Sequence, residues 1–265
     1  MNRLLTSSLL LALLLYCPAA SPPHVPAGNI AAFGSTSSFT NPSDYSPYAW
    51  WQANSGDLTE SDDTGVEDGD RIKSWPDQSG NNRHLVGPGG GGTSSLQYST
   101  VNTINGLPTV SGGSATWMDV NFGATLSQPV TIYIVVRITA LGTFAYWFDG
   151  LDVSNRIGGG KGNTDVPDMF ANTTLADEDA LANNTNYIFA FVFNTTSSEM
   201  WKNGTQVKTG AVGSHSVGGL TIGNLYGHAN GGSHRLAEII VYSGAHNSTQ
   251  IGNVVGWLNT KWAVY

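Results

Sequence analysis

The chain has 265 residues, of which 40% are apolar and 10% aromatic, so it can bury a sizeable core. Charged residues make up only 11%, against about 25% in an average globular protein. The formal net charge is −8 at pH 7, so the chain lacks the basic surface that nucleic acids and anionic membranes attract. We therefore expect no nucleic-acid partner.

Residues 1–20 have the pattern of an export signal. Met1-Asn2-Arg3 provides a positive start, Leu4–Tyr16 is strongly apolar, and small residues follow. The apolar run is shorter than the roughly 20 residues that a membrane-spanning helix needs, so we expect no stable span in the mature chain. A signal peptide predicts a protein that is secreted or lies on an extracellular or virion surface. The alternative is a hydrophobic N-terminal arm that is retained and buries itself in an assembly.

Cys17 is the single cysteine of the chain and falls inside this segment. Its removal with a signal peptide would leave no thiol, which excludes disulfide scaffolds, zinc–thiolate sites and cysteine nucleophiles. Lipidation of Cys17 is an alternative, which the bulky Tyr16 before it disfavours.

Beyond the signal, residues 21–44 are rich in Pro, Ser and Gly without an apolar period, which predicts a linker. From residue 45 onward strand patterns dominate. Residues 130–138, 187–193 and 235–242 predict central strands, and Asn-Gly within 200–207 predicts a hairpin. Gly-rich stretches, including 158–162, are expected to separate the strands. Many short strands with such turns indicate an all-β sandwich.

The C-terminal region alone has a helical pattern. Asn247 is a good N-cap residue, and Gln250 follows three residues later as in a capping box. Apolar residues then recur at helical spacing, at Ile251, Val254, Val255, Leu258 and Trp262. We expect a short amphipathic α-helix that packs on the sandwich.

Several segments, taken in order, resemble a known group of domains. They are Tyr48–Asn54, an acidic loop, Asp70–Asn82, Ile104–Pro108, Met200–Thr205, Gly219–Gly223, Leu236–Ser243 and Ile251–Trp262. This ordered set resembles the concanavalin A-like lectin/glucanase superfamily, in particular the laminin G-like domains of bacterial and phage surface proteins. The resemblance covers residues 45–265 and implies a jelly roll of two antiparallel sheets. It does not imply one activity, because lectins, glycan-binding modules, glycosidases, lyases and virion proteins share this fold.

The acidic loop is a candidate calcium site. Its candidate ligands are Asp62, Asp63, Glu67, Asp68 and Asp70. Calcium binds six to eight oxygen atoms from carboxylates, carbonyls and water. The resemblance adds that laminin G-like domains often hold one calcium ion near a rim. The alternative is a solvated acidic turn with Asp68-Gly69 at its corner.

Five other residues are candidates for binding a glycan: Trp75, Asp77, Asn81, Trp117 and Trp147. A tryptophan can stack on a sugar ring, while Asp77 and Asn81 hydrogen-bond its hydroxyls. In the alternative interpretation Trp75 is in the core and Asp77 organises a tight turn at Gly80. The sequence does not decide whether Trp117 and Trp147 are exposed.

Catalytic motifs were also considered. Sandwich glucanases place carboxylates at alternating positions of one strand, and the sequence has no such strand. It has neither a Gly-x-Ser-x-Gly elbow nor a His-Glu-x-x-His motif. We therefore expect a non-catalytic, exported module that binds carbohydrate or mediates adhesion, with calcium as a candidate cofactor. Two alternatives stay open: a structural subunit of a surface assembly that contacts neighbouring subunits, and a polysaccharide hydrolase or lyase with an unrecognised site.

Overall fold

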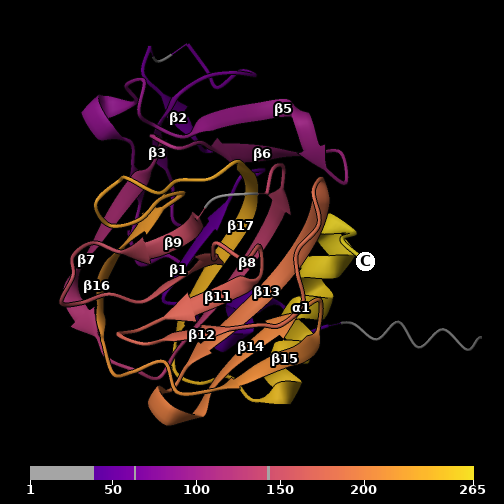
Figure 1. The fold of residues 1–265 in the computed structure, drawn as a ribbon. Helices are drawn as coiled ribbons and strands as arrows, with labels where there is room; N and C mark the ends of the chain where they lie inside the picture. Colours follow the sequence, from indigo (N-terminus) through magenta and orange to yellow (C-terminus); the bar gives the residue numbers. More distant parts are fainter. Residues whose placement is uncertain (1–38, 63, 142–143) are drawn as a thin grey trace, which may run out of the picture. The chain divides into compact units, whose positions relative to one another are not determined.

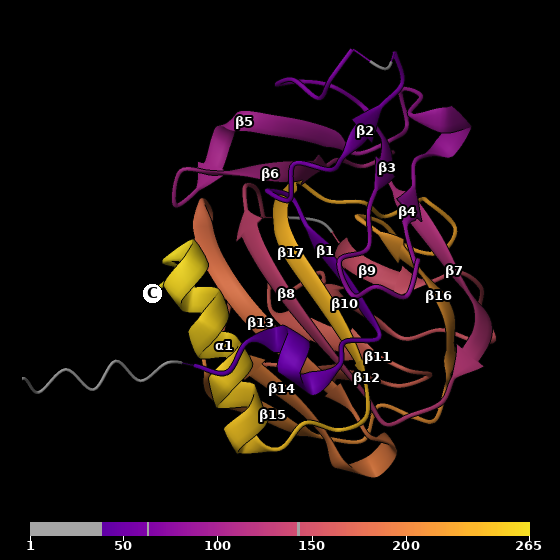
Figure 2. The ribbon, with the colours of Figure 1, turned by 180° about the vertical axis from the view of Figure 1, so that it is seen from behind.

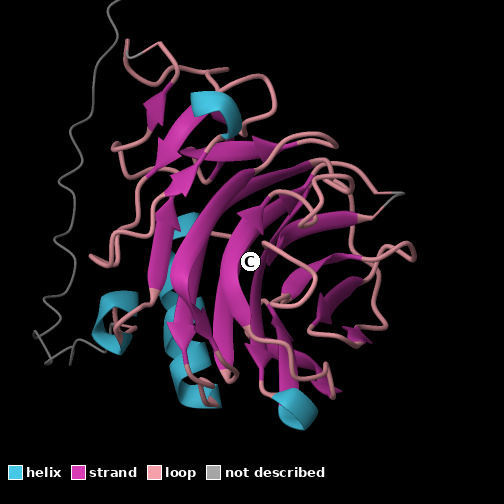
Figure 3. Ribbon diagram, turned by 90° about the vertical axis from the view of Figure 1, so that its left-hand side faces the viewer, coloured by secondary structure: helices cyan, strands magenta, loops and turns pink. Residues whose placement is uncertain are grey.

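The protein is described from a computed structural model, which covers residues 39–62, 64–141 and 144–265. These belong to a compact unit that runs from Ser38 to Tyr265. The predicted signal or arm at 1–20, Cys17 and most of the predicted linker lie outside the described residues. Figure 1 shows the fold, and Figure 3 shows that strands are its main secondary structure.

Two sheets form the sandwich, and all paired strands within them are antiparallel. The eight-stranded sheet has the order β15 (Thr205–Gly210), β14 (Ser198–Lys202), β13 (Thr185–Phe193), β8 (Val130–Ile138), β17 (His234–Ser243), β6 (Leu107–Gly112) and β5 (Gln97–Ile104), with β1 (Ala49–Gln52) also paired to β17. The nine-stranded sheet has the order β12 (Thr174–Ala176), β11 (Pro167–Phe170), β10 (Gly158–Lys161), β9 (Ala145–Gly150), β16 (Val217–Ile222), β7 (Met118–Leu126), β4 (Leu85–Val86), β3 (Ile72–Trp75) and β2 (Thr59–Glu60). The prediction of a two-sheet antiparallel sandwich is confirmed.

Three short 3-10 helices, η1 (Pro42–Tyr45), η2 (Pro88–Gly90) and η3 (Thr195–Ser197), connect strands or precede them. The predicted hairpin is β14 and β15. Its turn residues Asn203 and Gly204 have φ angles of 50° and 79°, as a type I′ turn requires.

Strand β8 is the predicted strand at 130–138, which is apolar on both faces. Ile132 and Ile134 point into the core between the sheets, together with residues of the nine-stranded sheet. Tyr133 and Val135 point the other way and pack under the C-terminal helix. Both faces of this strand are therefore buried.

Helix α1 (Ser248–Trp262) lies across the outer face of the eight-stranded sheet, over β8 and β13 (Figure 2). The predicted capping box is present, because the Asn247 side chain accepts from Gln250 N at 3.0 Å and the Gln250 side chain accepts from Asn247 N at 3.0 Å. The five apolar residues predicted at helical spacing are all buried. The expected helix is therefore confirmed. No helix within the described part of the chain is long and apolar enough to cross a membrane.

Replacing Asn247 with alanine is expected to lower the free energy of unfolding by about 1 kcal/mol, because the helix loses its N-cap bond. Urea unfolding followed by tryptophan fluorescence measures this change. Thr249→Ala, at an exposed position of the first turn, is the matched control and should change the value by less than about 0.5 kcal/mol. Equal effects of the two variants would contradict the role of the cap.

Glu238 holds the helix to the sheet. The side chain is fully buried, because a bulge in β17 between Leu236 and Glu238 turns it toward the helix. It accepts from Trp50 Nε1 at 2.6 Å, from Lys261 Nζ at 2.7 Å and from Trp262 Nε1 at 2.7 Å. Burial raises the pKa of Glu238, and the ammonium of Lys261 opposes the rise. The Glu238 carboxylate therefore has a structural role, in which it links β1, β17 and α1.

The last residues of the predicted linker pack on the sandwich. Residues 42–45 form η1, and the Pro42 carbonyl accepts from Tyr242 Oη at 2.9 Å. The Tyr45 hydroxyl accepts from Asn253 Nδ2 of the helix at 2.8 Å. The ring of Phe39 occupies the space beside Gly256 where a side chain would lie. The sequence did not predict this packing, because residues 39–45 have few apolar side chains and are held by a few aromatic rings and hydrogen bonds.

Candidate functional site

Two of the predicted ligand-binding tryptophans are core residues. Trp75 and Trp147 are both 0% exposed, and both belong to the cluster between the sheets. Trp147 stacks on Phe189 with ring centroids 4.8 Å apart. Neither ring has a free face, so the prediction that they stack on a sugar is wrong. Both lie on inward-facing positions of their strands, where large aromatic side chains fill the core.

Asp77 is used inside the turn, as the alternative interpretation predicted. Its Oδ1 accepts from Trp50 N and Ser79 N, each at 2.9 Å, and its Oδ2 accepts from Arg83 N at 2.9 Å. The carboxylate therefore joins the turn to the start of β1. With three backbone donors bound, this carboxylate organises the loop.

Asn81 lines a cavity of about 480 Å³ together with Tyr48, Trp50 and Arg83. The Asn81 amide donates to the Tyr48 carbonyl at 3.2 Å, and Arg83 Nη1 donates to the same oxygen at 2.8 Å. The Arg83 guanidinium lies 3.6 Å from the centroid of the Tyr48 ring. The Asn81 amide and the Arg83 guanidinium therefore donate to the cavity's own wall.

The carboxylates of the acidic loop accept hydrogen bonds from nearby chain. Asp62 Oδ1 accepts from Thr64 N at 3.1 Å and Thr64 Oγ1 at 2.6 Å. Asp68 Oδ1 accepts from Ser99 Oγ at 2.9 Å. These bonds lower the pKa of both carboxyls.

The remaining candidate calcium ligands are Asp63, Glu67 and Asp70. Asp70 Oδ2 accepts from the backbone N–H of Glu67 at 2.6 Å. Asp63 lies outside the described residues. Among the residues that are described, no group of three or more His, Cys, Asp or Glu side chains is arranged to hold a metal ion.

Trp117 lies just before β7 and is partly buried. Its ring stacks on His228, with centroids 3.9 Å apart and planes 9° from parallel. His228 Nε2 lies 3.4 Å from Asp119 Oδ2, and Asp119 Oδ1 accepts from Thr221 Oγ1 at 2.8 Å. One face of the Trp117 ring is thus covered by a residue of the same protein.

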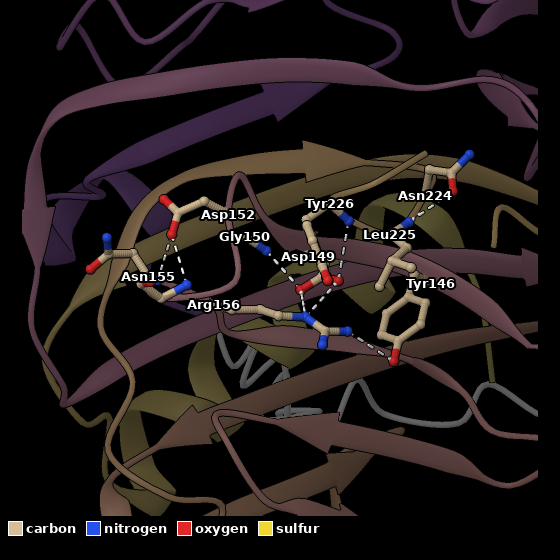
Figure 4. Close-up of polar contacts among 10 residues, drawn as sticks. Tyr146, Asp149, Gly150, Asp152, Asn155, Arg156, Asn224, Leu225 and Tyr226 are labelled. Atoms are coloured by element: carbon tan, nitrogen blue, oxygen red, sulfur yellow. Dashed lines mark hydrogen bonds and ion pairs between the residues drawn. The ribbon is translucent and has the colours of Figure 1, made fainter. Parts of the chain in front are cut away.

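A cluster that the sequence did not predict lies on the outer face of the nine-stranded sheet. Strand β9 contains a bulge: Tyr146 pairs with Gly160, whereas Phe148 pairs with Gly159. The extra residue places both Trp147 and Phe148 in the core. Tyr146 and Asp149, three residues apart, therefore both point away from the core, and both lie beside Arg156 (Figure 4).

Asp149 and Arg156 form a buried ion pair in this cluster. Arg156 Nε lies 2.9 Å from Asp149 Oδ1 and 3.0 Å from Oδ2. The Asp149 side chain is 0% exposed and that of Arg156 is 13% exposed. The backbone N–H groups of Gly150 and Tyr226 also donate to the carboxylate, at 2.8 and 3.3 Å. Burial raises the pKa of Asp149, and the hydrogen bond and charge of Arg156 oppose the rise.

The glycines of β10 make room for this pair. A Cβ atom on Gly158 would lie 2.9 Å from Asp149 Oδ1. The carboxylate therefore occupies the place that a side chain would take. The prediction that 158–162 is a break between strands is wrong, because Gly158–Lys161 is a paired strand. The glycines of this strand leave space for the Asp149 side chain of the neighbouring strand β9.

Three aromatic rings surround the Arg156 guanidinium. Its central carbon lies 4.4 Å from the ring centroid of Phe170, 4.9 Å from that of Tyr226 and 5.4 Å from that of Tyr146. Arg156 Nη2 also donates to Tyr146 Oη at 3.1 Å. Stacked cation–π contacts and the ion pair fix the guanidinium. We call Tyr146, Asp149, Arg156, Phe170 and Tyr226 the Arg156 cluster.

Asp168 lies next to this cluster on β11, two residues before Phe170 and opposite Gly160. Burial raises the pKa of Asp168 to about 6, although Lys161 and Arg156 oppose the rise. The side chain remains partly exposed. An acid with such a pKa can donate or accept a hydrogen bond near neutral pH, and groups of this kind gather at functional sites.

No protein-family model matches the sequence, and no curated protein is significantly similar to it. One similar structure is domain 4 of AbnA, a GH43 extracellular arabinanase from Geobacillus stearothermophilus, in complex with arabinotriose. It has a TM-score of 0.55 at 15% identity, covering 78% of this chain and 97% of that one.

Two toxin domains are also similar. The receptor binding domain of botulinum neurotoxin D gives a TM-score of 0.57 at 10% identity, covering 82% of this chain and 54% of that one. The binding domain of Paraclostridial Mosquitocidal Protein 1 gives 0.54 at 14% identity, covering 74% and 52%. At these identities the likeness shows the fold. The chain has a β-sandwich fold shared with carbohydrate-binding and receptor-binding domains.

Proposed function

We propose that this chain is a non-catalytic carbohydrate-binding module of the concanavalin A-like superfamily. Its glycan site is the outer face of the nine-stranded sheet at the Arg156 cluster. The observation that carries the proposal is the grouping of Tyr146, Phe170 and Tyr226 around one fixed guanidinium, beside a partly exposed carboxyl. On the other sheet, α1 covers the outer face over β8 and β13.

The chemistry of this surface suits a sugar. Aromatic rings pack against the apolar C–H faces of pyranose rings, and a few fixed polar groups select the hydroxyls. Arg156 has its charge balanced by Asp149, so it offers remaining N–H donors without attracting anions strongly. Asp168 supplies an acceptor, or a donor below its pKa of about 6. Such a face favours a neutral glycan.

The similar structures support the proposal through their fold. One of them is a domain solved with arabinotriose, and another concerns a botulinum neurotoxin that interacts with two ganglioside molecules. Export to the cell exterior is part of the proposal and rests on the pattern of residues 1–20. Calcium at the acidic loop is left as a separate question, which a chelator arm in the binding assay answers.

The test is a glycan array followed by calorimetry on the best neutral glycan. Phe170→Ala and Tyr226→Ala are each expected to weaken binding about tenfold, which corresponds to about 1.4 kcal/mol of lost stacking. Val86→Ala, at an exposed apolar position of β4 outside the cluster, is the control and should bind like the parent chain. Folded protein that binds no glycan, or ring variants that bind normally, would contradict the proposal and favour a structural role in an assembly.

A second candidate is a polysaccharide hydrolase or lyase that uses Asp168. The pKa of Asp168 is about 6, which lies in the range of a general acid or base. Incubation of the bound glycan with the protein distinguishes the two functions. New reducing ends or unsaturated products that disappear in Asp168→Asn would establish catalysis. An unchanged glycan supports the binding module.

A further inference from the structure

Two arginines face each other on neighbouring strands, away from the core. Arg137 of β8 pairs directly with Arg235 of β17. Their neighbours Val136 and Leu236 point into the core between the sheets. The arginines therefore lie on the opposite face, the one on which Tyr133 and Val135 pack under α1.

Neither guanidinium makes a hydrogen bond or ion pair with any residue that the structure describes. Both side chains are partly buried. Like charges directly opposite each other destabilise an antiparallel pair. Burial and the nearby positive charge of Arg137 lower the pKa of Arg235, and Asp68 opposes this. The arrangement costs stability unless something binds between the two groups.

The two arginines border a cavity of about 330 Å³. Its other walls include Asn102, Thr103, Thr139 and Asn184, whose side chains carry amide and hydroxyl groups. Two guanidinium groups with neutral donors around them provide the planar, forked donors that oxyanions accept. Arg156, by contrast, is paired with Asp149, which leaves no excess charge there.

We infer that the cavity at Arg137 and Arg235 binds an oxyanion group of the carboxylate, sulfate or phosphate class. The group neutralises the repulsion between the guanidinium groups and bridges strands β8 and β17. The site is independent of the proposed glycan site, because it opens on the outer face of the other sheet. A bound oxyanion explains why Arg137 and Arg235 face each other on this sheet in a chain whose net charge is −8.

The test is thermal unfolding of the full chain in sodium sulfate, compared with sodium chloride at the same ionic strength. Sulfate also stabilises proteins by exclusion from their surface, so the informative quantity is the saturable part of the shift. We expect a saturable rise in Tm at millimolar sulfate for the parent chain. Arg137→Gln and Arg235→Gln should each remove it, and in chloride both should be at least as stable as the parent. Lys208→Gln, which removes a distant surface charge, should keep the full rise.

Two further arms identify the source of the anion. Glucuronate is compared with glucose by calorimetry, and sulfate is used alone. Binding of glucuronate but not glucose, lost in Arg235→Gln, points to an acidic sugar. Binding of sulfate alone points to a small free anion. A parent chain that shows no saturable Tm shift in sulfate and no binding of glucuronate, or an equal Tm shift in the arginine variants and the parent, would overturn the inference.

Discussion

Replacing Arg156 with methionine is expected to lower the free energy of unfolding by about 3–5 kcal/mol and to abolish glycan binding. The variant leaves the Asp149 carboxylate buried without its counter-charge, and removal of one partner of a buried pair has this cost. It also removes the group around which Tyr146, Phe170 and Tyr226 are arranged. Urea unfolding measures the first effect and calorimetry the second.

A double variant separates charge from packing in this prediction. Asp149→Leu with Arg156→Met replaces the ion pair by apolar groups, and we expect it to recover most of the lost stability without recovering binding. Lys208→Met breaks a surface pair with Glu178 and is the control, with an expected change below about 1 kcal/mol. A single variant as stable as the parent chain would contradict the buried pair.

Replacing Asp168 with asparagine is expected to stabilise the protein at pH 7 by on the order of 2 kcal/mol while weakening glycan binding. Burial raises the pKa of Asp168 to about 6, against 3.8 for the ordinary group. The folded state therefore holds this proton to a higher pH than the unfolded state does. Unfolding releases the proton between about pH 4 and pH 6, so stability falls as the pH rises through that window.

The variant lacks this group, so its advantage should be absent near pH 4 and complete above pH 6. Urea midpoints at several pH values measure it. Asp152→Asn is the control with the opposite sign, since N–H groups of Asn155 and Ser154 lower the pKa of Asp152. Its contribution to stability is present at neutral pH and lost as the pH falls. A destabilised Asp168→Asn at pH 7 would contradict the account. A residue that lowers stability but aids binding is typical of a functional site.

The sequence predicts the fold well because the fold depends on local patterns. Alternation in 130–138 identified a central strand, and Asn247 with Gln250 identified the start of α1. The Asn203-Gly204 turn fixed a hairpin. Each of these signals is contained in a few consecutive residues, so no knowledge of distant contacts was needed.

The site was not predictable in the same way. Tyr146 and Asp149 are three residues apart in a strand, so simple alternation puts them on opposite faces, and the bulge brings them together. Trp75 and Trp147 were candidates because aromatic content alone does not distinguish an inward ring from an outward one. The role of Gly158 is visible only in the folded protein, where Asp149 of the adjacent strand β9 lies against it. Charged and aromatic residues in strands next to a Gly-rich strand are the sequence signal that points most closely to the Arg156 cluster.

The most direct test of the central claim is amide hydrogen exchange with and without the glycan selected on the array. We predict that bound glycan slows exchange in β9, β10 and β11 and in residues 224–228, which surround the Arg156 cluster. Exchange in β1 and in residues 78–83, at the cavity that Asn81 lines, should be unchanged. Protection confined to that cavity or to the outer face of the eight-stranded sheet would contradict the assignment of the glycan site.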